Sequence, residues 1–309
     1  MERSIPYRLK NRNAQPVGIH ANYSLKGMLL FGLPFVGFGL YFTLGSLGII
    51  EFDESKVNGP MWLLTAAGLV FFFGGLMLWG MGFRQFCLLR RIQKLADQYP
   101  NEPAMSDFPW DRSGFSPSRW VPVRKGVLMA LFFILFASIP NGIALSTDPT
   151  PLLLRLMTIL MNLIVIAVVY YMLKTLWHAI KFGRTRLQFP RFPLRLGETV
   201  DLEITLPPAL RRADKARLTL RCIKEFLESS GHGKNRSTRI VHEVLYESVK
   251  QQDSTDLATR PGAIYTRFTL PREASATQIQ GTPPHFWELE LQLEVPGLDL
   301  EQRYLLPVY

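Results

Sequence analysis

Four long apolar stretches constrain the fold of this chain more than any other feature of its sequence. Each could form a helix that crosses a bilayer, which needs about 20 mostly apolar residues. They run from about Ser24 to Ile50, Pro60 to Phe83, Gly126 to Ser146 and Leu152 to His178. Short connections join the first stretch to the second and the third to the fourth. The sequence therefore predicts two transmembrane helical hairpins.

Lysine and arginine are unevenly distributed around these stretches. The N-terminal tail, the loop at 84–125 and the residues after the fourth stretch are rich in them. The two short connections contain a single lysine, Lys56, together with several acidic residues. Because segments rich in lysine and arginine stay in the cytoplasm, we expect the N and C termini to be cytoplasmic.

The net charge of +10 has the same origin. Residues 187–309 hold 16 basic and 16 acidic residues, which leaves 19 basic and 9 acidic ones of the chain's 35 and 25 in residues 1–186. The imbalance thus lies in the membrane-spanning part, where it suits anionic lipid headgroups. It is not the footprint of a nucleic-acid-binding domain, so we expect membrane lipid and no nucleic acid as a partner.

The last third of the chain shows the alternation of apolar and polar residues that is typical of half-buried β-strands. Predicted strands cover 198–206, 216–226, 239–249, 263–270, 287–295 and 300–308. In the clearest one, WELELQLEV, Trp287 leads the apolar face and is expected to be buried. The opposite face, with Glu288 and Glu290, is expected to face water. A turn is predicted at the proline and glycine of 296–297.

Together these patterns predict a membrane α-helical protein with four transmembrane helices and a C-terminal all-β antiparallel sandwich of the immunoglobulin-like kind. The expected parts are an N-terminal tail (1–23), a first hairpin (24–83), a loop (84–125), a second hairpin (126–180) and the sandwich (187–309).

A resemblance supports this arrangement. The runs LTLRCIKEF, HEVLYESV and HFWELELQLEVPGLDLEQRYLLPVY resemble the arrestin-like sandwich of a group of uncharacterised bacterial inner-membrane proteins. The run YPNEPAMSDFPWDRSG at 99–114 resembles the same group, except that Ala104 stands where an aromatic residue is expected. The resemblance implies a multi-pass protein of the bacterial inner membrane and an arrestin-like fold. It implies no activity.

Motifs for catalysis, cofactors or metals do not stand out. The five histidines lack partners at metal-ligand spacing, and no nucleophile–base or paired-carboxylate pattern is visible. The run GHGKNR at 231–236 has the glycines and basic residues of a phosphate-binding loop. It lacks the GK[ST] ending and the strand–loop–helix setting, so a hairpin tip is the better interpretation. We expect no enzyme activity, no cofactor and no metal.

Three polar residues of the predicted spans are candidates for contacts inside the membrane. Asn162 could bond to Asn141 or Ser138 of the neighbouring helix, which would bind the helices together. Arg155 lies near the end of the fourth span, where it can reach the headgroups. Glycines recur in the first two spans and predict close helix contact.

The loop at 84–125 is too long to be a simple connector. Its first part, to Gln98, has the spacing of a basic amphipathic helix suited to anionic headgroups. Its second part carries four aromatic candidates for docking or partner contact: Phe108, Trp110, Phe115 and Trp120. Two interpretations stay open, since these rings could anchor the loop at the membrane interface or dock on the sandwich.

Two function classes follow. The first is a membrane-anchored interaction or scaffold protein that presents a cytosolic β-sandwich to a protein partner or to a second copy. The alternative is an accessory or regulatory subunit of a membrane transport or envelope-assembly complex, in which the helices do the main work.

Overall fold

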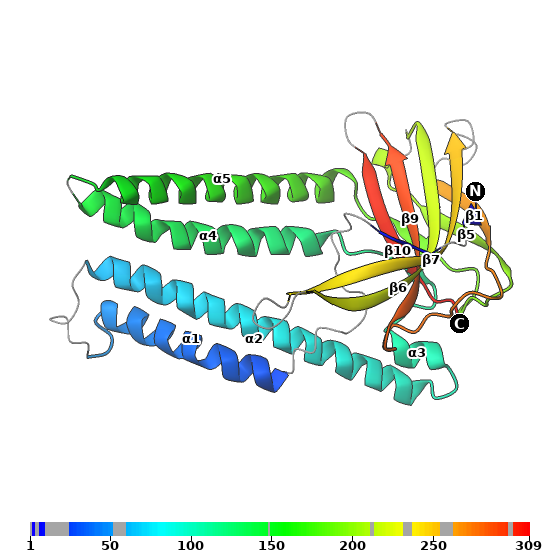
Figure 1. Ribbon diagram of the computed structural model, residues 1–309, viewed down its shortest axis with the longest axis horizontal. Coiled ribbons are helices and arrows are strands. Elements are labelled where there is room, and N and C mark those ends of the chain that lie inside the picture. The colour runs from blue at the N-terminus through cyan, green and yellow to red at the C-terminus, as the bar shows by residue number, and fades with distance from the viewer. Residues whose placement is uncertain are drawn as a thin grey trace. The chain divides into compact units, whose positions relative to one another are not determined.

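The computed structural model describes residues 2–3, 6–9, 25–51, 60–147, 149–210, 213–230, 237–253, 262–295 and 299–309. The chain forms two compact units (Figure 1). The helical unit contains residues 23–89 and 119–180. The β unit is assembled from three separate segments, residues 1–22, 90–118 and 181–309.

Four helices of the described residues are long and apolar enough to cross a membrane. They are α1 (Leu25–Ser46), α2 (Met61–Gln98), α4 (Trp120–Ser146) and α5 (Leu152–Lys181). In each helix, no more than 17% of the most apolar stretch of 18 residues is buried within the protein. This is expected for helices that face lipid. The protein is thus a multi-pass membrane protein. Helix α4 begins six residues before the predicted span, and α2 continues 15 residues beyond Phe83 as the amphipathic pattern predicts.

Helices α1 and α2 lie side by side (Figure 1). They pack closely through glycines, as predicted. A Cβ atom on Gly39 would lie 2.7 Å from the carbonyl oxygen of Gly68, and one on Gly75 would lie 2.9 Å from the backbone nitrogen of Val36. Near one end of this contact the hydroxyl oxygens of Ser46 and Thr65 are 2.8 Å apart. Small residues allow this approach because no side chain separates the two backbones.

We therefore expect Gly39→Leu to force α1 away from α2, while Gly37→Leu is tolerated because a Cβ on Gly37 meets nothing within 4 Å among the described residues. In a Cys87→Ser background, cysteines at 46 and 65 should form a disulfide in native membranes. Gly39→Leu should remove most of this crosslink and Gly37→Leu should keep it. Equal yields in both variants would contradict the close contact.

The β unit consists of two antiparallel sheets. The larger has the order β1-β7-β6-β9-β10, with β2 also paired to β7, and the smaller has the order β3-β4-β5-β8. The strands of the larger sheet are β1 (Glu2–Arg3), β2 (Tyr7–Arg8), β6 (Lys215–Ser230), β7 (Ser237–Asp253), β9 (His285–Glu294) and β10 (Leu300–Leu306). Those of the smaller are β3 (Gly114–Phe115), β4 (Arg186–Gln188), β5 (Thr199–Thr205) and β8 (Ala263–Thr269). The predicted fold class, four apolar helices followed by an antiparallel sandwich, is confirmed.

The main core lies between the two sheets. Leu218 and Leu220 of β6 and Trp287 of β9 face Leu202 and Ile204 of β5 across it. Trp287 is fully buried, as predicted, and its indole Nε1 donates a 2.8 Å hydrogen bond to the carbonyl oxygen of Ser275. This bond satisfies the polar atom that a buried tryptophan brings into a core.

Two segments far from the sandwich in sequence complete the β unit. The N-terminal tail supplies β1 and β2, and residues 90–118 supply the short helix α3 (Pro103–Asp107) and strand β3. Patterns in the sequence do not predict these elements, because two-residue strands carry no periodicity.

Strands β6 and β7 extend beyond the rest of their sheet. Strand β9 pairs with β6 only as far as Lys224, whereas β6 and β7 stay paired to Ser230 and Ser237. The result is a two-stranded ribbon, residues 225–230 and 237–242, that projects from the sheet (Figure 1). Leu227 on this ribbon is 54% exposed. The GHGKNR run and the turn at 296–297 lie outside the described residues.

Candidate functional site

The outer face of the larger sheet points away from the main core. It holds buried charged side chains beside a second apolar cluster. Its side chains come from β6, β7, β9 and β10. They form a polar half around Arg221 and an apolar half around Phe286. Both halves are largely shielded from solvent.

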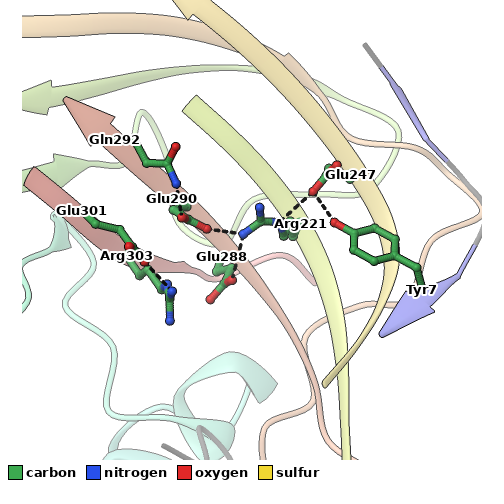
Figure 2. A network of polar contacts seen from close by, with 8 residues as sticks. All are labelled: Tyr7, Arg221, Glu247, Glu288, Glu290, Gln292, Glu301 and Arg303. Atoms are coloured by element: carbon green, nitrogen blue, oxygen red, sulfur yellow. Dashed lines mark hydrogen bonds and ion pairs between the residues drawn. The ribbon is translucent and has the colours of Figure 1, made fainter. Parts of the chain in front are cut away.

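Arg221 is the centre of the polar half (Figure 2). Its Nε donates a 2.8 Å hydrogen bond to Glu247 of β7, and its Nη1 donates to Glu290 of β9. Glu288 lies 3.9 Å from the same Nη1. Tyr7 of β2 donates a 2.5 Å bond from its hydroxyl to Glu247. One arginine thus joins three strands, and Tyr7 attaches the N-terminal strand to it.

In this network, burial and the neighbouring side chains shift the pKa values of Arg221 and Glu247 in opposite directions. Burial alone would raise the pKa of Glu247, but hydrogen bonds from Arg221 and Tyr7 outweigh it and hold that pKa below its usual value. Burial also favours loss of the proton from Arg221, yet the bond to Glu247 and the charge of Glu290 raise the pKa of the guanidinium. Arg221 and Glu247 therefore stay ionised at neutral pH.

The prediction that Glu288 and Glu290 face water is wrong. Their side chains are 2% and 5% exposed. Alternation along β9 correctly places them opposite Trp287. The polar face of the strand is shielded from solvent because these carboxylates lie beside β6, which supplies Arg221. A buried carboxylate is tolerated when a cation and hydrogen bonds compensate its lost hydration.

Residues 102–115, which we call the docking segment, cover the apolar half. Ala104 and Met105 of α3 and Trp110 after it pack into a second cluster with four residues of the sandwich, Ile223, Val244, Ile279 and Phe286. Trp110 is 5% exposed, and Ala104 is 1% exposed. Leu95, near the end of α2, packs against the same cluster.

Asp107 anchors the docking segment by polar contacts. Its carboxylate accepts 2.8 Å hydrogen bonds from the backbone N–H groups of Ile279 and Gln280 and from the hydroxyl of Tyr309. Trp110 donates from Nε1 to the same hydroxyl at 3.2 Å. Burial and the nearby charge of Asp107 raise the pKa of Tyr309, so the phenol keeps the proton that it donates.

The four aromatic candidates occupy different settings. Phe108 and Trp110 lie together, with ring centroids 4.7 Å apart. Phe115 in β3 is partly buried and packs against both clusters of the sandwich. Trp120 begins α4 in the helical unit and is 41% exposed. The first three thus contact the sandwich, whereas Trp120 has the exposed setting typical of an interfacial ring.

Two of the intramembrane candidates, Asn141 and Asn162, contact each other. The side-chain amides of Asn141 in α4 and Asn162 in α5 bond reciprocally at 3.0 and 3.1 Å. Such bonds hold transmembrane helices together, at about 1 kcal/mol each. Arg155 lies in the first turn of α5 with an exposed side chain.

One buried pair was not predicted. The Nε2 atom of His242 in β7 lies 2.9 Å from a carboxylate oxygen of Glu225 in β6, and both side chains are at most 2% exposed. The pair lies at the base of the projecting ribbon, beside the ring of Phe286. Among the described residues no group of three or more His, Cys, Asp or Glu side chains could hold a metal ion.

The two cysteines differ in a way that provides a probe of folding. Cys87 is exposed, while Cys222 is buried in the main core, and burial raises the pKa of its thiol to about 12. Because the thiolate is the reactive form, we expect a maleimide at pH 7 to label Cys87 readily. Cys222 should react only when the sandwich opens. Rapid labelling of Cys222 in a Cys87→Ser variant without denaturant would contradict the burial of Cys222 in the main core.

Comparison with models of known protein families and with curated proteins finds no match for this chain.

Proposed function

We propose that this chain is a membrane-anchored interaction or scaffold protein that presents its β-sandwich to a protein partner in the cytoplasm. One observation supports the proposal most strongly. The β unit is built from all three segments that flank the two hairpins, residues 1–22, 90–118 and 181–309. The N-terminal strands and residues 102–115 are packed onto the sandwich, so the surface of this unit is formed before a partner arrives. Such preorganisation favours binding because less entropy is lost when a partner docks.

The projecting ribbon supplies a surface for such a partner. An isolated two-stranded hairpin is marginally stable in water, yet this one is held at its base by the buried pair of His242 and Glu225. Further out, Arg8 and Arg239 form ion pairs with Glu228, but these pairs are exposed and contribute little to the stability of the ribbon. A stiffened ribbon with an exposed Leu227 is suited to binding rather than to packing within the chain.

Photo-crosslinking in native membranes tests this proposal. A photoreactive amino acid in place of Leu227 should give a discrete protein adduct. The same amino acid in place of Thr199, exposed on the smaller sheet, serves as the matched control and should give less. If the position of Leu227 yields lipid adducts alone, or if both positions yield the same adducts, the sandwich does not present this surface to a protein.

A second candidate function is an accessory or regulatory subunit of a membrane transport or envelope-assembly complex. The helical unit supports it through a shallow apolar groove of about 540 Å³ on α1, formed by Leu33, Pro34, Gly37, Phe38 and Tyr41. Gly37 leaves room there for the helix of another subunit or of a second copy. Crosslinking from Gly37 would favour this alternative if it captured another membrane protein.

The proposed location is the bacterial inner membrane, with an arrestin-like sandwich and both termini in the cytoplasm. The three segments of the β unit must share one side of the membrane, and they carry most of the flanking lysine and arginine residues. We expect a reporter that is active only outside the cytoplasm to be inactive when it is joined through a linker after Tyr309. Inserted within 52–59 it should be active. The opposite result would reverse the orientation.

A further inference from the structure

Among the described residues, short segments of the N-terminal tail pair with the outer edge of β7. Strand β7 is 17 residues long. Among the described residues its edge pairs only with β1, at Ser248 and Glu247, and with β2, at Val244 and Glu243. The backbone N–H of Leu9 adds one bond of 3.0 Å to the carbonyl oxygen of His242. The edge of a long strand is a template for any extended chain, and here two-residue strands occupy it.

Side chains of the tail give this pairing a specific chemistry. Tyr7 and Leu9 lie on the outer face, where both pack against the apolar cluster, and the hydroxyl of Tyr7 donates to Glu247. Arg8 lies on the opposite face and forms a 2.8 Å ion pair with Glu228. The pattern is an aromatic residue, a basic residue and an aliphatic residue in one extended run.

The charge of the edge suits that pattern. Glu228, Glu243 and Glu247 line the positions that Tyr7 and Arg8 face. Arg221 and Arg239 already bind two of these carboxylates, yet each of the two still accepts a further bond from the tail. An incoming strand with a basic residue at the position of Arg8 would find the same partners.

We propose that the β7 edge is an exchangeable docking site for an extended segment of a protein partner with an aromatic–basic–aliphatic sequence. The chain's own residues 6–9 occupy it in cis. This inference rests on the proposed function and specifies its recognition chemistry, which is addition of a strand to a sheet edge. The tail is a competitor that belongs to the same chain, and a segment of the same chain acts at an effective concentration on the order of millimolar.

A peptide with the sequence of residues 2–9, ERSIPYRL, is the probe. We expect it to bind the full membrane protein that lacks residues 2–9 at least about tenfold more tightly than the intact protein, because the tethered tail no longer competes. A peptide with Arg8→Glu should bind the shortened protein about tenfold more weakly. Protein with Glu228→Arg should reverse this preference. Protection of Cys222 from maleimide checks that each variant is folded.

A disulfide lock tests the edge without removing any residue. Arg8 and Glu243 are direct cross-strand neighbours. Cysteines at both positions in a Cys87→Ser background should therefore form a disulfide that links the tail covalently to β7. We expect the locked protein to bind no peptide and to recover binding after reduction. If the shortened protein binds no peptide, or if the lock leaves binding unchanged, the docking site is wrong.

The outcomes also separate this inference from the proposed function. Partner adducts from the position of Leu227 without any peptide binding would retain the interaction function and reject the β7 edge. Peptide binding that the lock abolishes, without any protein adduct, would support the edge and count against the proposed scaffold role.

Discussion

Replacing Arg221 by methionine should lower the free energy of unfolding of the β unit by about 3–5 kcal/mol, the usual cost of removing one partner from a buried ion pair. Methionine has a similar length and would fill the space. It cannot compensate the charges of Glu247, Glu288 and Glu290, whose side chains are 16%, 2% and 5% exposed. Glu247 would also lose its hydrogen bond from Arg221, so its carboxylate would no longer be held in place to accept the bond from Tyr7 of β2.

Arg267 provides the matched control. It also lies on a strand and pairs with a carboxylate, that of Asp201, but the two side chains are 69% and 67% exposed. Water replaces such a partner easily, so Arg267→Met should leave the unfolding curve almost unchanged. Maleimide labelling of Cys222 against urea, in full-length protein with Cys87→Ser, measures both variants. Equal shifts would mean that burial does not decide the role of Arg221.

Replacing Trp110 by alanine should have an effect of similar size, about 3–5 kcal/mol, because truncating a buried tryptophan leaves a cavity and removes a large apolar contact. The docking segment would keep the hydrogen bonds of Asp107 to Ile279 and Gln280 but lose its largest side chain in the second cluster. Partial opening of the segment should follow, with the outer face of Phe286 newly exposed.

Trp120→Ala is the control for this change, since Trp120 belongs to the helical unit and is 41% exposed. Limited proteolysis in native membranes should show faster cleavage within 99–118 for Trp110→Ala and wild-type cleavage for Trp120→Ala. The urea midpoint from Cys222 labelling should fall only for Trp110→Ala. A wild-type midpoint for Trp110→Ala would show that the ring anchors the loop without stabilising the sandwich.

The sequence predicted the long elements well, for a simple reason. Four spans and six strands each repeat their apolar pattern over at least seven residues, so periodicity identifies them without any tertiary information. Trp287 is buried as predicted because it begins the most regular of these strands. The reciprocal contact of Asn141 and Asn162 was one of two predicted pairings, since helical hairpins bring such positions together.

The short elements and the polar face could not be predicted in this way. Strands β1, β2 and β3 have two residues each, and their pairing depends on segments more than 70 residues away in the sequence. Nothing in the run around Asp107 shows that its carboxylate binds the backbone at Ile279. Alternation in β9 could separate Glu288 from Trp287, but it carries no information on what covers each face.

The three-segment construction of the β unit also fixes an order of events during synthesis. The docking segment leaves the ribosome about 180 residues before β10, a delay of roughly 10 to 40 s at ordinary elongation rates. Until β9 is made, Trp110 and Met105 lack part of the cluster that buries them, because Phe286 belongs to β9 and Ile279 lies just before it. Insertion of both hairpins therefore precedes completion of the sandwich. An interruption of translation before β10 would leave a protein that is correctly inserted in the membrane yet exposes an aggregation-prone surface.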